Sequence, residues 1–139
     1  MTATLLPQSE TITTTEAPSL WRVGLTAGLL ASVATTAIAV VAGAAGVSFE
    51  VDGEAIPMAG YAQMTLIGTV LGVILAKALR RWARHPQQTF VRSCVALTAL
   101  SIVPDVTTGF DAASAITLAL AHVVAAVIIV PRLADRLAH

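Results

Sequence analysis

The sequence predicts an all-α membrane protein, a four-transmembrane-helix bundle with a short extracellular β-hairpin between helices 1 and 2. Of its 139 residues, 56% are hydrophobic and only 12% are charged, about half the charged fraction of a typical soluble domain. Three runs contain no Asp, Glu, Lys or Arg (23–49, 55–76 and 112–131), and each is as long as the roughly 20 residues that cross the hydrocarbon core. In addition, a four-span topology places all basic residues on the same side of the membrane.

This composition excludes several classes of protein. A small soluble domain needs a polar surface, and a disordered chain combines low hydrophobicity with high charge. Zero net charge and few aromatic residues argue against a nucleic-acid partner. The single cysteine, Cys94, excludes an internal disulfide and a Cys-only metal site, and no cofactor is expected.

The chain begins with a segment, residues 1–18, that is rich in Thr and contains no basic residue. We expect it to form a disordered cytoplasmic tail, followed by one transmembrane domain over 19–139. The first helix is predicted at about 21–46. Because this apolar segment far exceeds the 7–15-residue core of a secretory signal, it is predicted to remain as an uncleaved anchor.

The connection after the first helix has the pattern of a hairpin. Val47 and Phe49 alternate with polar residues, and Asp52-Gly53 favours a type I′ turn. With that turn, Phe49 faces Ile56 and Val47 faces Met58. An isolated hairpin is marginally stable, so its apolar side is expected to rest on the top of the bundle.

The remaining helices are predicted at about 58–82, 86–106 and 112–131. The third is the weakest span, because it carries Arg92 near one end and Asp105 near the other. Pro86 suits a first helical turn. From Pro86 to Val103 the helix measures about 27 Å, just enough to cross the hydrocarbon.

The distribution of charge predicts the orientation. The basic residues lie at the N-terminal end, in the 2–3 connection and at the C-terminal end: Arg22, Lys77, Arg80, Arg81, Arg84, Arg92, Arg132 and Arg136. All charged residues in and next to the 1–2 and 3–4 connections are acidic. Four spans with both termini in the cytoplasm place every positive charge inside, whereas three spans would not. We therefore expect a multi-pass protein of the bacterial cell membrane.

Several short motifs resemble a known family. They are Trp21-Arg22, Ile56-Pro57, Arg84-His85-Pro86 followed by Phe90, Ser101 to Pro104, and the last-span pair His122 and Pro131. Over about residues 20–135 the chain resembles the actinobacterial four-span membrane proteins grouped as domain of unknown function 6069. The resemblance implies a fold and no activity, so it transfers no catalytic residue.

His122 is the first candidate for a functional residue. It lies near the middle of the last span, on a face of mostly small residues, so it is expected to point into the bundle. Thr35, Thr69 and Thr98 fall at a similar depth. Two interpretations stay open: a neutral His bonded to a threonine or a backbone carbonyl, or a residue that relays protons or binds a ligand.

Asp105 also has two interpretations. If the third span breaks at Val103, Asp105 enters the first turn of a new short helix, where an acid complements the helix dipole. Alternatively, Asp105 forms a polar pocket in the outer leaflet with Gln63 and Tyr61. Asp105 and His122 differ by roughly 8 Å along the membrane normal, so no direct pair is expected.

Two clusters of charge are surface candidates. Lys77, Arg80, Arg81 and Arg84 form an inner-leaflet basic patch suited to anionic lipid headgroups, although topology alone explains it. Glu50, Asp52 and Glu54 are weak metal candidates, because three acids are too few ligands for an all-protein site. No metal is expected.

Three functions remain. The chain lacks the HExxH, GxSxG and P-loop motifs. This favours a non-enzymatic accessory, assembly or lipid-interacting scaffold protein. The alternative is a small oligomeric transporter or channel with His122 in the path, and the second alternative is a lipid-modifying enzyme. The expected partners are the lipid bilayer, anionic headgroups on the cytoplasmic side, and another membrane protein or a second copy of the chain.

Overall fold

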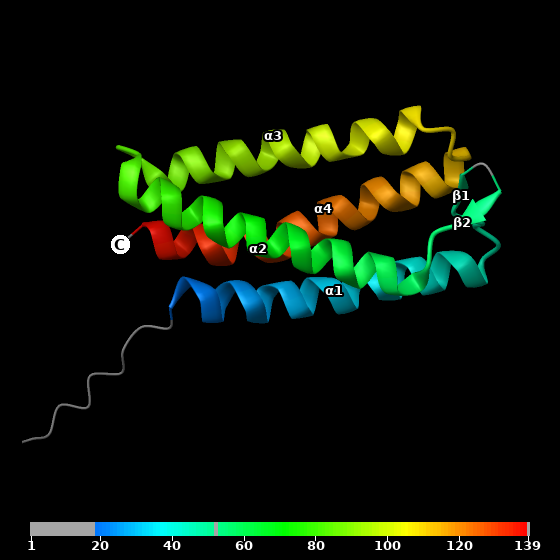
Figure 1. Cartoon of the computed structure of the whole chain (residues 1–139), viewed down its shortest axis with the longest axis horizontal. Coiled ribbons are helices and arrows are strands. Elements are labelled where there is room, and N and C mark those ends of the chain that lie inside the picture. Colours follow the sequence, from blue (N-terminus) through cyan, green and yellow to red (C-terminus); the bar gives the residue numbers. More distant parts are fainter. Residues whose placement is uncertain (1–18, 52, 139) are drawn as a thin grey trace, which may run out of the picture.

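The computed structural model describes residues 19–51 and 53–138, which form four long helices and one short paired connection (Figure 1). The helices are α1 (Leu20–Ala44), α2 (Met58–Trp82), α3 (Pro86–Thr107) and α4 (Ala112–Ala134), and α4 continues into the 3-10 helix η1 (Asp135–Leu137). All four are long and apolar enough to cross a membrane. This confirms the prediction of four helices that are long and apolar enough to be membrane spans. The predicted tail, residues 1–18, lies outside the described residues.

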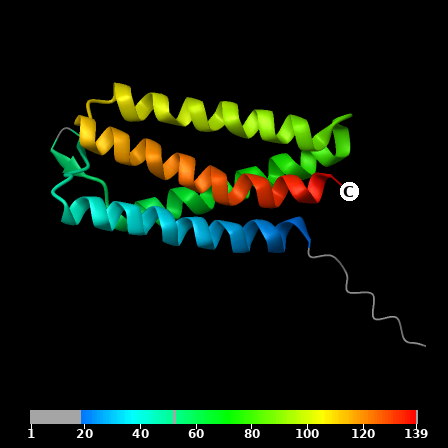
Figure 2. The same ribbon diagram turned by 180° about the vertical axis from the view of Figure 1, so that it is seen from behind.

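Consecutive helices run in opposite directions, so the bundle has two distinct ends (Figures 1 and 2). The end that holds the α2–α3 connection and the end of α4 also holds the arginines of both elements, and we call it the basic end. The opposite end, with the short strands, is the hairpin end. The helix α1 packs extensively on α2 and α4, and α4 packs on α3, whereas α2 and α3 contact each other much less. These two helices diverge towards the hairpin end (Figure 1).

The third helix is continuous past Val103, which corrects the idea that a new short helix begins there. Pro104 lies inside α3, and its carbonyl accepts the backbone N–H of Thr108 at 2.9 Å. Asp105 therefore stands in the last turn of a helix rather than the first. At that end the helix dipole disfavours an acid, so helix capping does not explain Asp105.

The connection at the hairpin end contains two short antiparallel strands. Strand β1 (Glu50–Val51) pairs with β2 (Glu54–Ala55), and Glu50 lies opposite Ala55. The next pair places Phe49 opposite Ile56, whose N–H donates to the Phe49 carbonyl at 3.1 Å. Phe49 is only 2% exposed and has a φ of 53°, a value that a bulky residue rarely adopts. Val47 and Met58 lie outside the ladder.

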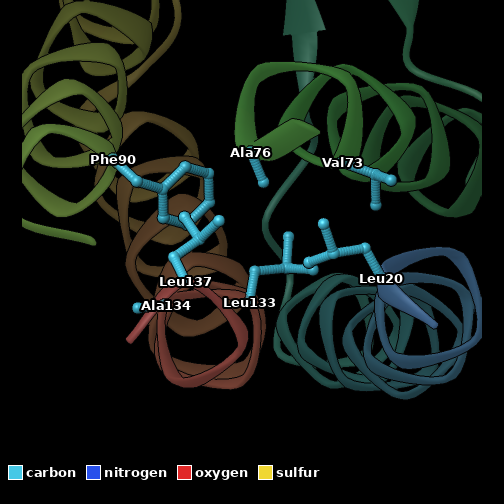
Figure 3. Close-up of a cluster of buried hydrophobic side chains, with 7 residues drawn as sticks. All are labelled: Leu20, Val73, Ala76, Phe90, Leu133, Ala134 and Leu137. Atoms are coloured by element: carbon cyan, nitrogen blue, oxygen red, sulfur yellow. The ribbon is translucent and has the colours of Figure 1, made fainter. Parts of the chain in front are cut away.

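Two apolar clusters hold the ends of the bundle together. The cluster at the basic end joins all four helices and is drawn in Figure 3: Leu20, Val73, Ala76, Phe90, Leu133, Ala134 and Leu137. The cluster at the hairpin end consists of Ala39, Phe49, Tyr61 and Leu118. The connection between α1 and α2 thus contributes Phe49 to the core of the bundle.

Small residues let α1 approach α2 closely. A Cβ atom added to Gly24 would lie 2.1 Å from Val73 Cγ2, and one added to Gly28 would lie 2.6 Å from Thr69 Cγ2. Gly68 on α2 is exposed and would meet nothing within 4 Å. The glycine pair of α1 therefore serves packing within one chain, whereas Gly68 does not.

Candidate functional site

An acidic and a basic side chain meet inside the bundle. Asp105 in the last turn of α3 and His122 in the middle of α4 approach to 3.1 Å between Oδ2 and Nδ1. The expectation that they would not pair is therefore wrong. Counting residues along the membrane normal treats helices as upright and ignores side-chain length. Because α4 runs obliquely across the bundle (Figure 1), and both side chains extend towards each other, the offset disappears.

The hydrogen-bond geometry places a hydrogen on Nδ1 of His122. His122 Nδ1 also lies 3.0 Å from the Leu118 carbonyl. A carbonyl oxygen only accepts, so Nδ1 carries a hydrogen and faces both oxygens. Its N–H is aligned with the carbonyl, and Asp105 Oδ2 has no aligned hydrogen-bond partner among the described residues. The carboxylate is thus in contact with the imidazole and can still accept a hydrogen bond.

The two side chains differ in exposure. The Asp105 side chain is 9% exposed and the His122 side chain 39%. Residues four, seven and eleven positions from His122 share its face of α4, and these residues, Leu118, Ala115 and Leu133, are all buried. His122 therefore lies on the interior face and is nevertheless accessible. An ionisable pair in this position can hold a proton without exposing a net charge to lipid.

Tyr61 is buried within electrostatic range of Asp105, whereas Gln63 is exposed. Tyr61 is 8% exposed, and its hydroxyl has no hydrogen-bond partner among the described residues. The ring packs edge-on against Phe49 with centroids 5.7 Å apart, and the Asp105 carboxylate is within electrostatic range. Gln63 is exposed two residues further along α2. The structure thus brings together two of the three residues expected in an outer-leaflet pocket.

The threonines do not form one layer around His122. Thr35 of α1 and Thr65 of α2 share a hydrogen bond of 3.0 Å, and Thr69 donates to the Thr65 carbonyl at 2.7 Å. These hydroxyls form a polar seam between α1 and α2. Thr98 lies on the other side, in an apolar groove of about 420 Å³ between α3 and α4. The partner of His122 in its own helix is a backbone carbonyl, one of the two partners that its structural interpretation allowed.

The sequence reasoning missed a hydrogen-bonded cluster at the hairpin end. Asp111 caps α4 by accepting the N–H groups of Ala113 and Ser114 at 2.9 and 3.1 Å. It also accepts the Ser114 hydroxyl at 2.5 Å, and Ser114 Oγ accepts the Phe49 N–H at 3.1 Å. The signal available in the sequence is Asp111 with Ser114 three residues later, a helix N-terminus pattern.

This cluster affects the ionisation of Asp111. Hydrogen bonds from Ser114, above all from its hydroxyl, hold the pKa of the Asp111 carboxyl below its usual range. Ser48 adds a longer bond to Asp111 Oδ2 at 3.4 Å. The ionised form of Asp111 is therefore linked to the position of the buried Phe49.

Residues 15–139 match the sequence profile of a family of unknown function, DUF6069. The chain belongs to this family. The match covers all four helices of the DUF6069 chain and carries no activity. The chain matches no curated protein and no solved structure. Its function has therefore to be argued from its own residues.

The predicted lipid-headgroup residues lie together on the basic end. Lys77, Arg80, Arg81 and Arg84 are all exposed. The two arginines in the last turn of α2 also complement the helix dipole. The Lys77 ammonium lies 5.6 Å from the ring centroid of Trp21, a cation–π distance. The surface therefore combines cations with an aromatic side chain, as expected near a membrane interface.

The weak metal candidates are not assembled into a site. Glu50 and Glu54 are exposed on the two short strands, and Asp52 lies outside the described residues. Among residues 19–51 and 53–138, no three His, Cys, Asp or Glu side chains come close enough to hold an ion.

Proposed function

We propose that this membrane protein uses the Asp105–His122 pair to bind and release a proton, as a small oligomeric transporter or channel. The 3.1 Å contact between the two side chains carries the proposal. Titratable groups inside transmembrane helices mark proton relays and transport pathways. Here two helices that are joined by a short connection each contribute one such group.

The electrostatics of the pair favour coupling to a second event. A carboxylate beside an imidazolium, and a carboxyl beside a neutral imidazole, both have zero net charge. Gain or loss of one further proton leaves a net charge in a medium of low dielectric constant, which is costly. Such a proton therefore moves with a compensating ion, a ligand or a change in exposure.

Proton flux into liposomes tests this proposal. The purified chain is reconstituted with a pH-sensitive dye inside, and a potassium diffusion potential is imposed with valinomycin. We expect acidification faster than in empty vesicles, and its loss in Asp105→Asn and His122→Gln. Asp135→Asn and His85→Gln make the same chemical changes at exposed positions of the basic end and should retain the flux. A wild-type rate equal to that of empty vesicles would overturn the proposal.

A second candidate function, a lipid-interacting scaffold or accessory subunit, is favoured by the exposed cations of the basic end. In this proposal the basic end faces the cytoplasm of a bacterial cell, with both termini inside, and contacts anionic headgroups. Each basic residue near such a surface contributes about 1 kcal/mol of attraction. Native mass spectrometry in mild detergent tests it: phosphatidylglycerol should remain bound, and be lost when Lys77, Arg80, Arg81 and Arg84 are replaced by Gln. The same spectra report a second copy or another subunit.

One observation supports the hypothesis of a lipid-modifying enzyme, and a second feature that would support it is not found among the described residues. The contact between Asp105 and His122 removes the objection that the two groups are too far apart. However, no metal-ligating cluster stands beside them among the described residues, and we do not propose a reaction.

A further inference from the structure

An apolar groove of about 420 Å³ lies between α3 and α4. Its lining extends from Cys94 to Ile102 on α3 and from Val123 to Pro131 on α4. Eight residues of helix measure about 12 Å, and one leaflet contributes about 15 Å to a hydrocarbon core of about 30 Å. A single acyl chain can therefore extend along the whole groove.

Arg92 stands at the edge of this groove, on the side of the basic end. It precedes Val95 by three residues and Ala99 by seven, and both of these residues line the groove. At this spacing the three share one stripe of α3. Arg92 is exposed, and a long side chain leans towards the N-terminus of its helix, which for α3 is at the basic end. Its guanidinium group is therefore directed from the groove towards the level of the headgroups.

No acidic side chain of the two helices accompanies Arg92. The helix α3 contains no Asp or Glu before Asp105, and α4 contains none. Among the described residues Arg92 takes part in no ion pair. It lies six residues after Pro86, about 9 Å into its helix, where a lone charge is costly and is usually paired. A counter-ion from the lipid phase would lower this cost.

The two features together define the ligand. A guanidinium group binds two phosphate oxygens at once, and the groove accepts an apolar chain. A zwitterionic phospholipid also carries an ammonium group, for which α3 and α4 offer no carboxylate near Arg92. An anionic phospholipid brings no such cation. It therefore matches both the charge of Arg92 and the apolar surface next to it.

We propose that the groove between α3 and α4 binds one anionic phospholipid, with its phosphate on Arg92 and one acyl chain between the two helices. The inference requires no proton flux and no particular orientation in the membrane. It rests on the second candidate function in one respect, since both involve an anionic lipid. Its site is separate from the four cations of that proposal, so the two can fail independently.

Photolabelling in nanodiscs of phosphatidylcholine tests the proposal. The two probes are phosphatidylglycerol and phosphatidylcholine with identical acyl chains, each carrying a diazirine in one chain, and the protein is the full-length chain. We expect phosphatidylglycerol to label residues 94–102 and 123–131 more strongly than phosphatidylcholine does. Excess unlabelled phosphatidylglycerol should displace the label.

One pair of variants tests the role of the charge. Arg92→Gln removes the cation and should lower labelling of the groove by phosphatidylglycerol about five- to tenfold, to the level given by phosphatidylcholine. Arg22→Gln is the matched control, because Arg22 is an exposed arginine in the first turn of α1 at the same end. It should retain the preference. Should Arg92→Gln fail to fold, the comparison of the two probes on the wild-type chain decides.

A second pair of variants tests the role of the groove. Ala99→Phe places a large ring in the groove and should exclude the acyl chain, so that labelling by both probes falls at residues 94–102. Ala96→Phe makes the same change at an exposed position of α3 that does not line the groove. Its labelling should equal that of the wild-type chain.

Four results would overturn the inference. They are equal labelling of the groove by the two probes, a preference that survives Arg92→Gln, labelling indifferent to Ala99→Phe, and a dimer joined through α3 and α4 that excludes both lipids. The variant with Gln at Lys77, Arg80, Arg81 and Arg84 separates the two lipid proposals. Selective labelling of the groove that persists in this variant supports the inference, and labelling lost there but not in Arg92→Gln assigns the lipid to the four cations instead.

Discussion

Asp105 occupies an unfavourable position for an acid, and His122 is what makes it tolerable. Asp105 lies at the C-terminal end of α3 and its side chain is 9% exposed, so both burial and the helix dipole oppose the charge of its carboxyl group. The imidazole at 3.1 Å supplies the compensating hydrogen or charge. The two residues should therefore behave as one unit.

A double-mutant cycle measures this coupling. Asp105→Asn and His122→Gln should each lower the free energy of unfolding, and the double variant should lose less than the sum. We expect a coupling energy of about 1 kcal/mol, within the range of polar pairs in membrane proteins. Unfolding in mixed micelles gives the values, with His85→Gln as the control background. Additive losses would show that the contact does not contribute.

Glycines differ in what their missing side chains permit. Gly28→Ala brings a Cβ to 2.6 Å from Thr69, so it should destabilise the bundle by about 1–3 kcal/mol through overpacking. Gly68→Ala meets nothing within 4 Å and should be neutral or stabilise the helix by up to about 1 kcal/mol. Thermal unfolding of the two variants under the same detergent conditions checks both. A larger loss at Gly68 would indicate that a second chain packs on α2.

At the scale of elements, the α1–α2 connection is held by the N-terminus of α4. Ser114 is fully buried and joins Asp111 to the Phe49 N–H. Ser114→Ala removes the acceptor of a buried N–H, which should lower the free energy of unfolding by about 1–3 kcal/mol. Thr117→Val one turn later is the control. Hydrogen exchange should locate the loss at residues 48–51, and a uniform loss along α4 would contradict this role.

The same contact predicts a dependence on pH. Because the folded pKa of Asp111 is lowered by the Ser114 hydroxyl, its contribution is complete above the unfolded value of about 3.9. The contribution disappears as the pH falls through the folded pKa. Asp111→Asn keeps a capping oxygen and removes the titration. The wild-type chain should therefore have a higher Tm than Asp111→Asn at neutral pH, and this difference should shrink in acid. A constant difference would contradict the assignment.

At the scale of the whole molecule, the uneven distribution of charge predicts the orientation. All described Lys and Arg side chains except Arg92 belong to the basic end or the turns next to it, and Arg92 lies in the first half of α3. With Cys94 replaced by Ala, an impermeant maleimide on intact cells should label Glu54→Cys. It should label Ala138→Cys only after permeabilisation. The opposite pattern would show that the topology is inverted. Labelling of both cysteines on intact cells would contradict three crossings between residues 54 and 138.

Much of the architecture follows from the sequence by itself. The number of helices depends on the length of apolar runs, and the expected orientation depends on which connections carry arginines, and both are properties of linear order. The structure contains a long apolar helix at the weak third segment, which the C-terminal arginines favour because, with an even number of crossings, they lie on the same side as the other basic residues. The candidate residues His122, Asp105 and Tyr61 were visible as polar groups in apolar segments.

Only the tertiary structure decided which of these groups meet. In a membrane, interior and lipid-facing positions are both apolar, so periodicity barely reports how a helix is rotated or tilted. The oblique path of α4 brings His122 to Asp105, which residue counting had separated. The way the helices are rotated and tilted also places Gly28 against Thr69 and leaves Gly68 exposed. Phe49, in the connection between α1 and α2, packs into the cluster at the hairpin end. Contacts of this kind depend on the packing of four helices at once, and no single segment contains that information.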